Sequence, residues 1–73
     1  MNVSFEEKFR AGLNCYIETE RKKPTAIADA AGIPRSTFSK IRQGKQRIYG
    51  DQLYAIARAE KLTPEQIAGY ANN

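Results

Sequence analysis

One cysteine, Cys15, and no histidine occur among the 73 residues of this chain. A disulfide framework therefore cannot form, and neither a tetrahedral zinc site nor a histidine-based proton relay can be assembled. So short a chain must then be held together by the packing of one apolar core. No apolar run approaches the roughly 20 residues that a membrane span needs. We therefore expect a single globular domain over residues 1–73.

The same counts narrow the classes of function. Serine and threonine hydroxyls have no histidine to activate them, and the sequence holds neither a carboxylate cluster nor a phosphate-binding glycine loop. We therefore expect no catalytic residue, no metal and no cofactor. No secretion signal is recognisable, so we expect a cytoplasmic protein. No separate sensor domain is present, so no small-molecule ligand is expected either.

The charge of the chain is unevenly distributed. Twelve Lys and Arg against eight Asp and Glu give a net charge of +4, which favours a polyanionic partner such as nucleic acid or an anionic membrane surface. Five basic residues and no acidic residue lie within residues 35–47: Arg35, Lys40, Arg42, Lys45 and Arg47. The segment is either an ordinary solvated surface or a binding site, and the structure that carries it decides between them.

The first helix is predicted over residues 5 to about 20. Ser4 and Glu7 form the S-x-x-E capping box that opens a helix, and Pro24 prevents its continuation. Apolar residues recur at every third or fourth position of this segment: Phe5, Phe9, Leu13, Tyr16 and Ile17. One face of the helix is therefore expected to join the core.

Two short helices are predicted in the middle of the chain. Thr25 can cap the first of them, which stops at Gly32, a residue suited to the left-handed end of a helix. Pro34 suits the first position of the next, which is expected over residues 34–42 before Gly44. Its apolar side is formed by Phe38 and Ile41. The polar residues on its other faces are Arg35, Ser36, Ser39, Lys40 and Gln43.

Two further helices complete an all-α fold. The fourth is predicted over residues 50–60 from apolar residues at helical spacing, namely Leu53, Ile56 and Ala57. The fifth begins with a threonine cap, a proline and a glutamine, namely Thr63, Pro64 and Gln66. Ile67 and Tyr70 are expected to face inward from this last helix.

Residues 25–44 have the spacing of a helix-turn-helix. A small residue at Ala28 allows the two helices to cross closely, Gly32 turns the chain, and Ile33 anchors the turn to the core. With Phe38 and Ile41 inward, the basic side of the second helix is exposed. Such a helix fits a DNA major groove, which is about 12 Å wide.

With these residues in place, the sequence resembles the Xre/Cro-repressor, or lambda-repressor-like, family over nearly the whole chain. The matching positions are Ile27-Ala28, Gly32-Ile33, Ser36-Thr37-Phe38-Ser39, Ile41, Gly44-Lys45 and Leu53-x-x-Ile56-Ala57-x-Ala59. The resemblance implies a compact five-helix lambda-repressor-like domain that binds double-stranded DNA in the major groove. It also implies a prokaryotic or phage regulator, nucleoid-associated in the cytoplasm, or in the host cytoplasm if a phage encodes it.

The resemblance also assigns roles to individual residues. The exposed positions that read base edges are Arg35, Ser36 and Lys40, and Gln46 matches a loop position that reaches the groove in some relatives. Arg35 suits guanine, since arginine is the commonest bidentate partner of guanine O6 and N7. The expected phosphate contacts are Thr25, Thr37, Ser39, Gln43, Lys45 and Arg47.

The predicted function is that of a sequence-specific transcriptional regulator, a repressor or Cro-like protein that binds an inverted-repeat operator as a homodimer. One recognition helix covers too few base pairs for useful specificity, so a second copy is needed. Candidate contacts between copies are Leu62, Ile67 and Tyr70. Two alternatives stay open: the antitoxin of a toxin-antitoxin pair, and a protein-interaction module that does not bind DNA.

Overall fold

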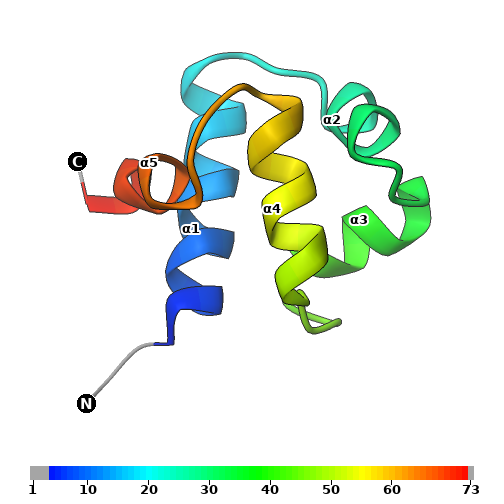
Figure 1. The fold of residues 1–73 in the computed structure, drawn as a ribbon, viewed down its shortest axis with the longest axis horizontal. Coiled ribbons are helices and arrows are strands. Elements are labelled where there is room, and N and C mark those ends of the chain that lie inside the picture. Colours follow the sequence, from blue (N-terminus) through cyan, green and yellow to red (C-terminus); the bar gives the residue numbers. More distant parts are fainter. Residues whose placement is uncertain (1–3, 73) are drawn as a thin grey trace.

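Five α-helices follow one another along the chain, as predicted. A computed structural model describes residues 4–72. Its helices are α1 (Phe5–Thr19), α2 (Pro24–Ala31), α3 (Arg35–Arg42), α4 (Gly50–Ala59) and α5 (Pro64–Gly69), followed by the 3-10 helix η1 (Tyr70–Asn72). In Figure 1, α4 lies between two groups, with α1 and α5 on one side and α2 and α3 on the other. Among the described residues, no helix has both the length and the apolar character needed to cross a membrane.

The predicted capping signals open the first and last α-helices. The Ser4 side chain accepts a hydrogen bond of 3.2 Å from the Glu7 amide at the start of α1. At the start of α5 the Thr63 hydroxyl accepts from the Gln66 amide, and the Gln66 side chain accepts from the Thr63 amide in return. Each contact satisfies an amide that has no partner within the helix, so these two starts are determined locally.

The start of α2 differs from the prediction by two residues and the start of α3 by one, and both differences come from a proline. Thr25 does not cap α2, because Pro24 already occupies the first turn and Lys23 takes the extended conformation that precedes a proline. Pro34 is not the first residue of α3. It lies extended at the N-cap, with φ −54° and ψ 138°, and its carbonyl accepts from the Phe38 amide.

One apolar core receives side chains from all five helices. Its largest fully buried side chains are Phe9, Leu13, Ile27, Phe38, Ile41, Ile48, Ile56 and Ile67. Phe5 departs from the expected stripe, since it lies at the very start of α1 and is 42% exposed, in contact with the Phe9 ring. The core residues of α3 are therefore in the same apolar cluster as those of α1 and α4, which fixes the orientation of α3.

Candidate nucleic-acid interface

Helix α3 has one buried face and one exposed face, as the sequence predicts. Phe38 is 2% exposed and Ile41 is fully buried. The exposed residues are Arg35, Ser36, Ser39 and Lys40, and Thr37 is half-buried at the boundary. Basic and hydroxyl side chains therefore cover the side of α3 that the core leaves free.

The connection between α2 and α3 holds the two helices at a fixed angle. Gly32 ends α2 in the left-handed conformation, with φ 72°, which glycine adopts without strain. The Ile33 amide then donates to the Ala28 carbonyl at 2.9 Å, and the Ile33 side chain enters the core. The predicted roles of Gly32 and Ile33 are therefore confirmed, and Ala28 is fully buried.

Two polar residues of α1 hold the other end of α3. Arg10 donates through Nε to the Ile41 carbonyl at 3.0 Å, and Asn14 donates through Nδ2 to the Arg42 carbonyl at 3.0 Å. Arg42 returns a hydrogen bond of 2.9 Å from its Nε to Asn14 Oδ1. Carbonyls in the last turn of a helix lack partners within it, so these contacts stabilise its end. Sequence reasoning missed them, although positions 10 and 14 lie one helical turn apart beside the apolar stripe.

Arg35, the first residue of α3, forms an ion pair with Asp29 of α2. Arg35 Nε lies 3.1 Å from Asp29 Oδ1, and Nη2 lies 2.7 Å from Oδ2. The hydrogen bonds from Arg35 lower the pKa of the Asp29 carboxyl, and the same bonds raise the pKa of Arg35. Both side chains are exposed. This pair was not predicted from the sequence.

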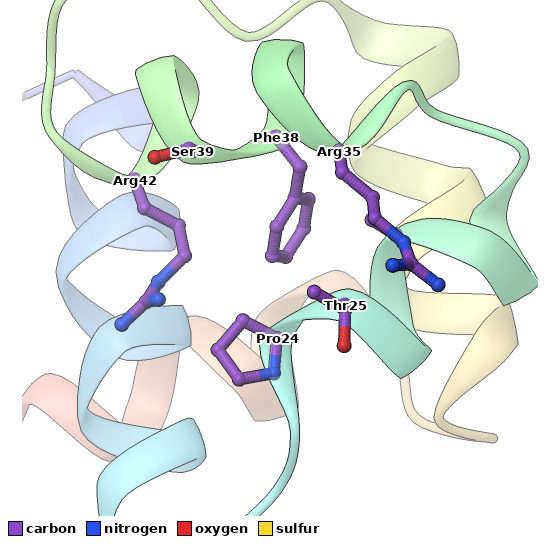
Figure 2. A pocket seen from close by; sticks show the side chains of 7 residues that line it. Pro24, Thr25, Arg35, Phe38, Ser39 and Arg42 are labelled. Atoms are coloured by element: carbon purple, nitrogen blue, oxygen red, sulfur yellow. The ribbon is translucent and has the colours of Figure 1, made fainter.

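A hollow lies between the start of α2 and the exposed side of α3. Figure 2 shows Arg35 and Arg42 on either side of Phe38, with Pro24 and Thr25 of α2 opposite them. The full lining is Pro24, Thr25, Ala28, Arg35, Phe38, Ser39 and Arg42. The structure thus brings two expected phosphate contacts, Thr25 and Ser39, beside the guanidinium of Arg42, which was not among the predicted contacts.

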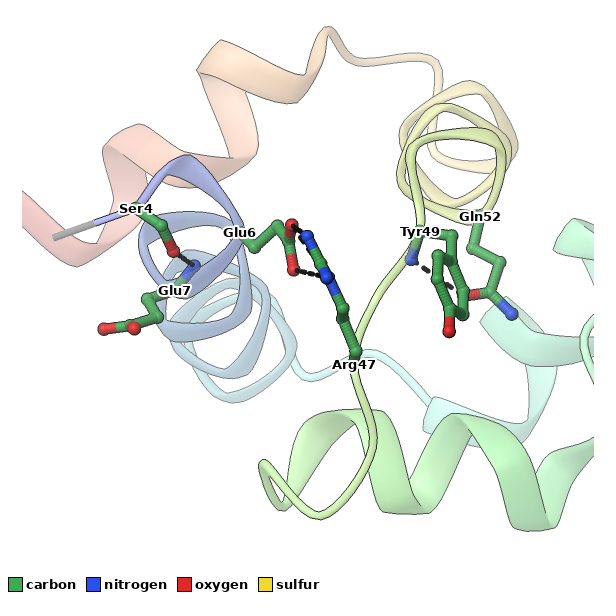
Figure 3. A network of polar contacts seen from close by, with 6 residues as sticks. All are labelled: Ser4, Glu6, Glu7, Arg47, Tyr49 and Gln52. Atoms are coloured by element: carbon green, nitrogen blue, oxygen red, sulfur yellow. Dashed lines mark hydrogen bonds and ion pairs between the residues drawn. The ribbon is translucent and has the colours of Figure 1, made fainter.

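The segment between α3 and α4 carries four more of the predicted residues. Lys45 is exposed and Gln46 is half-buried, while Gln43 at the end of α3 donates to the Ser39 hydroxyl at 2.9 Å. Arg47 forms an ion pair with Glu6 of α1, with Nη2 3.1 Å from Oε1 (Figure 3). The hydrogen bonds to Glu6 raise the pKa of Arg47.

Residues 13–72 match the family model of the Cro/C1-type HTH DNA-binding domain. The chain belongs to this family. No significant match to a curated protein or to a solved structure was found. The family match and the exposed basic side of α3 together identify the chain as a DNA-binding regulatory protein.

One of the three candidate dimer contacts of this Cro/C1-type domain is not on the surface. Ile67 is fully buried in the core, so its side chain offers no surface to a second copy, and it is removed from the candidates. Leu62 and Tyr70 are half-buried, and the Tyr70 ring meets Tyr16 edge-on at 5.0 Å. Leu62 also lines a largely apolar hollow between α4 and α5 with Tyr54, which is 60% exposed. We call this the α4–α5 hollow.

Proposed function

We propose that this Cro/C1-type protein is a transcriptional repressor of the phage-repressor or Cro kind, which binds an inverted-repeat operator as a homodimer. The observation that carries the proposal is the exposed basic side of α3, held opposite the buried Phe38 and Ile41. A helix with one side fixed in the core can enter the major groove without losing its shape. In this arrangement α3 is the recognition helix.

Base reading is assigned to four side chains of α3 and the following loop. Arg35 pairs with guanine O6 and N7, and Lys40 donates to the same kind of base edge from one turn further on. Ser36 contacts either base of a pair, and Gln46 suits adenine, which offers N6 and N7 to an amide. Arg35 is the main source of specificity, because a bidentate contact discriminates best between base pairs.

Positioning on the DNA backbone is assigned to the polar residues around α3. These are Thr25, Thr37, Ser39, Gln43, Lys45 and Arg47, to which we add Arg42 because it lines the same hollow as Thr25 and Ser39. Glu6 competes with phosphate for Arg47, whereas Lys45 has no ion pair among the described residues. Lys45 is therefore expected to contribute more than Arg47 to the salt dependence of binding.

Selection of bound sites from random DNA, followed by two variants, tests these roles. Arg35→Ala should weaken binding to the selected site about ten-fold or more and binding to random duplex by a clearly smaller factor, because a base contact is lost together with one positive charge. Lys45→Ala should weaken both and reduce the slope of affinity against salt by roughly one per protomer. If Arg35→Ala weakened both duplexes equally, Arg35 would be a phosphate contact and the assignment of base reading would be wrong.

The α4–α5 hollow favours a second candidate function, that of an antitoxin covered by a different protein. An exposed apolar surface away from the recognition helix is what such a partner would need, and Tyr54 and Leu62 provide one. The two functions differ in the effect of Tyr54→Ser. A duplex with two half-sites should bind a homodimer more tightly than a duplex with one half-site. In a homodimeric repressor whose copies meet at this hollow, the variant should reduce this gain in affinity. In an antitoxin, whose hollow serves another protein, this gain should not change.

A further inference from the structure

Asp29 lies in the last turn of α2, six residues before Arg35, and its carboxylate reaches across the turn to the first residue of α3. Both carboxylate oxygens take part, with distances of 3.1 Å to Nε and 2.7 Å to Nη2. The side chains remain more than half exposed, 63% for Arg35 and 54% for Asp29. The pair is therefore on the surface that is proposed to face DNA, and the folding of the core does not require it.

The geometry of this pair determines which hydrogens of Arg35 remain available. A guanidinium has five N–H groups in one plane, one on Nε and two on each Nη nitrogen. Asp29 engages the side of the fork, through Nε and one hydrogen of Nη2. The other three hydrogens have no partner among residues 4–72, and two of them, one on Nη1 and one on Nη2, form the end of the guanidinium, away from the carboxylate.

Guanine presents O6 and N7 side by side in the major groove, and an arginine can pair with them through the end or through the side of its fork. Asp29 occupies the side, so only the end can meet the base. The pair also restricts the rotamers of a long flexible side chain before DNA arrives, which lowers the entropy lost on binding.

We propose that Asp29 is a positioning residue for DNA recognition, which fixes Arg35 so that the end of its guanidinium selects guanine. The inference rests on the proposed base-reading role of Arg35. Asp29 also increases the specificity of DNA binding in a second way, because its negative charge is repelled by phosphates. It therefore disfavours binding to random DNA, where no guanine contact offsets the repulsion.

The test compares Asp29→Ala with a matched control, Glu6→Gln. Glu6 also pairs with an arginine through Nε and Nη2, but its partner Arg47 is assigned to phosphate. Affinities are measured by fluorescence anisotropy at fixed salt, on random duplex and on four further duplexes. These four differ only at the base pair where Arg35→Ala loses the base preference. Circular dichroism checks that each variant is folded.

Asp29→Ala should reduce the preference for guanine at this base pair by roughly two- to five-fold, the range expected from one exposed ion pair. Binding to random duplex should stay the same or tighten. Glu6→Gln should change the affinity for all duplexes by one common factor. In the Arg35→Ala background, Asp29→Ala should have no effect on base preference, since the side chain that it positions is gone.

Two results would overturn this role of Asp29 while leaving the proposed function intact. One is an equal change on all four duplexes after Asp29→Ala, which would make Asp29 a general electrostatic contributor. The other is a stronger preference for guanine in Asp29→Ala, which would mean that the pair masks Arg35. By contrast, if no base preference of the wild-type protein depended on Arg35, the base-reading role of Arg35 would be wrong. The role of Asp29 would then be wrong as well.

Discussion

Gly12 lies where the backbone of α5 passes close to α1. A Cβ atom at this position would contact the Ile67 carbonyl oxygen and would lie 2.7 Å from the Ala68 Cα, both of which are backbone atoms. Neither neighbour can rotate away, as a side-chain end could. The glycine therefore determines how near α5 can come to α1, and through Ile67 it affects the packing of the core.

We predict that Gly12→Ala destabilises the protein by about 2 kcal/mol, because overpacking costs more than the helix gains from alanine. Urea unfolding followed by circular dichroism measures the change. Gly69→Ala is the matched control, since nothing lies within 4 Å of a Cβ there. The control should be neutral or slightly stabilising. A Gly12→Ala protein as stable as the wild type would show that α1 and α5 are not packed this closely.

At the scale of single residues, sequence periodicity predicts burial well and long-range partners poorly. The inward positions of Phe38 and Ile41 follow from a spacing of three within one helix. In the sequence, Gly12 only lowers the helix propensity of α1. The backbone that leaves no room for a side chain at this position belongs to Ile67, 55 residues further along the chain. Asp29 gives no local signal for Arg35, because the two belong to different helices joined by a turn.

At the scale of helices, α3 depends on its neighbours more than on its own sequence. It has eight residues, and isolated helices of that length are marginal in water. Its first turn follows Pro34, and its last carbonyls are held by Arg10 and Asn14 of α1. The helix that carries the proposed base contacts is therefore ordered by α1 at the end where the basic loop begins.

We predict that replacing Asn14 by alanine loosens the end of α3 before the rest of the fold. The variant loses two hydrogen bonds, one to the Arg42 carbonyl and one from Arg42 Nε, each worth about 1 kcal/mol. Amide exchange at residues 43–45 should therefore accelerate by roughly five- to thirty-fold. Hydrogen exchange followed by NMR measures this effect, and Lys8→Ala, an exposed change on the same helix, is the control. Unchanged exchange at residues 43–45 would show that the contact does not stabilise α3.

The helix boundaries show which local signals are reliable. Capping side chains set the starts of α1 and α5 as predicted, because the cap and the helix are adjacent in sequence. The predicted start of α2 is wrong by two residues and that of α3 by one, since a proline can occupy either the N-cap or the first turn. Only the packing of the neighbouring helices decides between those two positions.

At the scale of the whole molecule, the proposed site is assembled from several helices. α3 supplies the base-reading side chains, α2 supplies Asp29 and Thr25, and α1 supplies the residues that hold α3 and pair with Arg47. The sequence predicted the all-helical fold and the exposed side of α3. It did not predict the polar contacts between helices, because these depend on how the helices pack against one another.

The dimer proposal predicts the arrangement of half-sites on DNA. Two recognition helices related by a two-fold axis lie about 34 Å apart, so the centres of the two half-sites should be about 10 base pairs apart on one face of the duplex. We expect a weak dimer in solution that DNA stabilises, because the candidate surface at Leu62, Tyr70 and the α4–α5 hollow is small.

Measurement of affinity on duplexes with different half-site spacings, combined with sedimentation, checks this prediction. Affinity should be highest near the 10-base-pair spacing and should fall to the level of a single half-site when about five base pairs are inserted, since the insertion places the two half-sites on opposite faces of the duplex. Tyr54→Ser, an exposed change in the α4–α5 hollow, should reduce the gain at the best spacing without affecting binding to one half-site. A monomer that binds one half-site with the full affinity of the inverted repeat would contradict the homodimer, because the second copy would then add nothing to recognition.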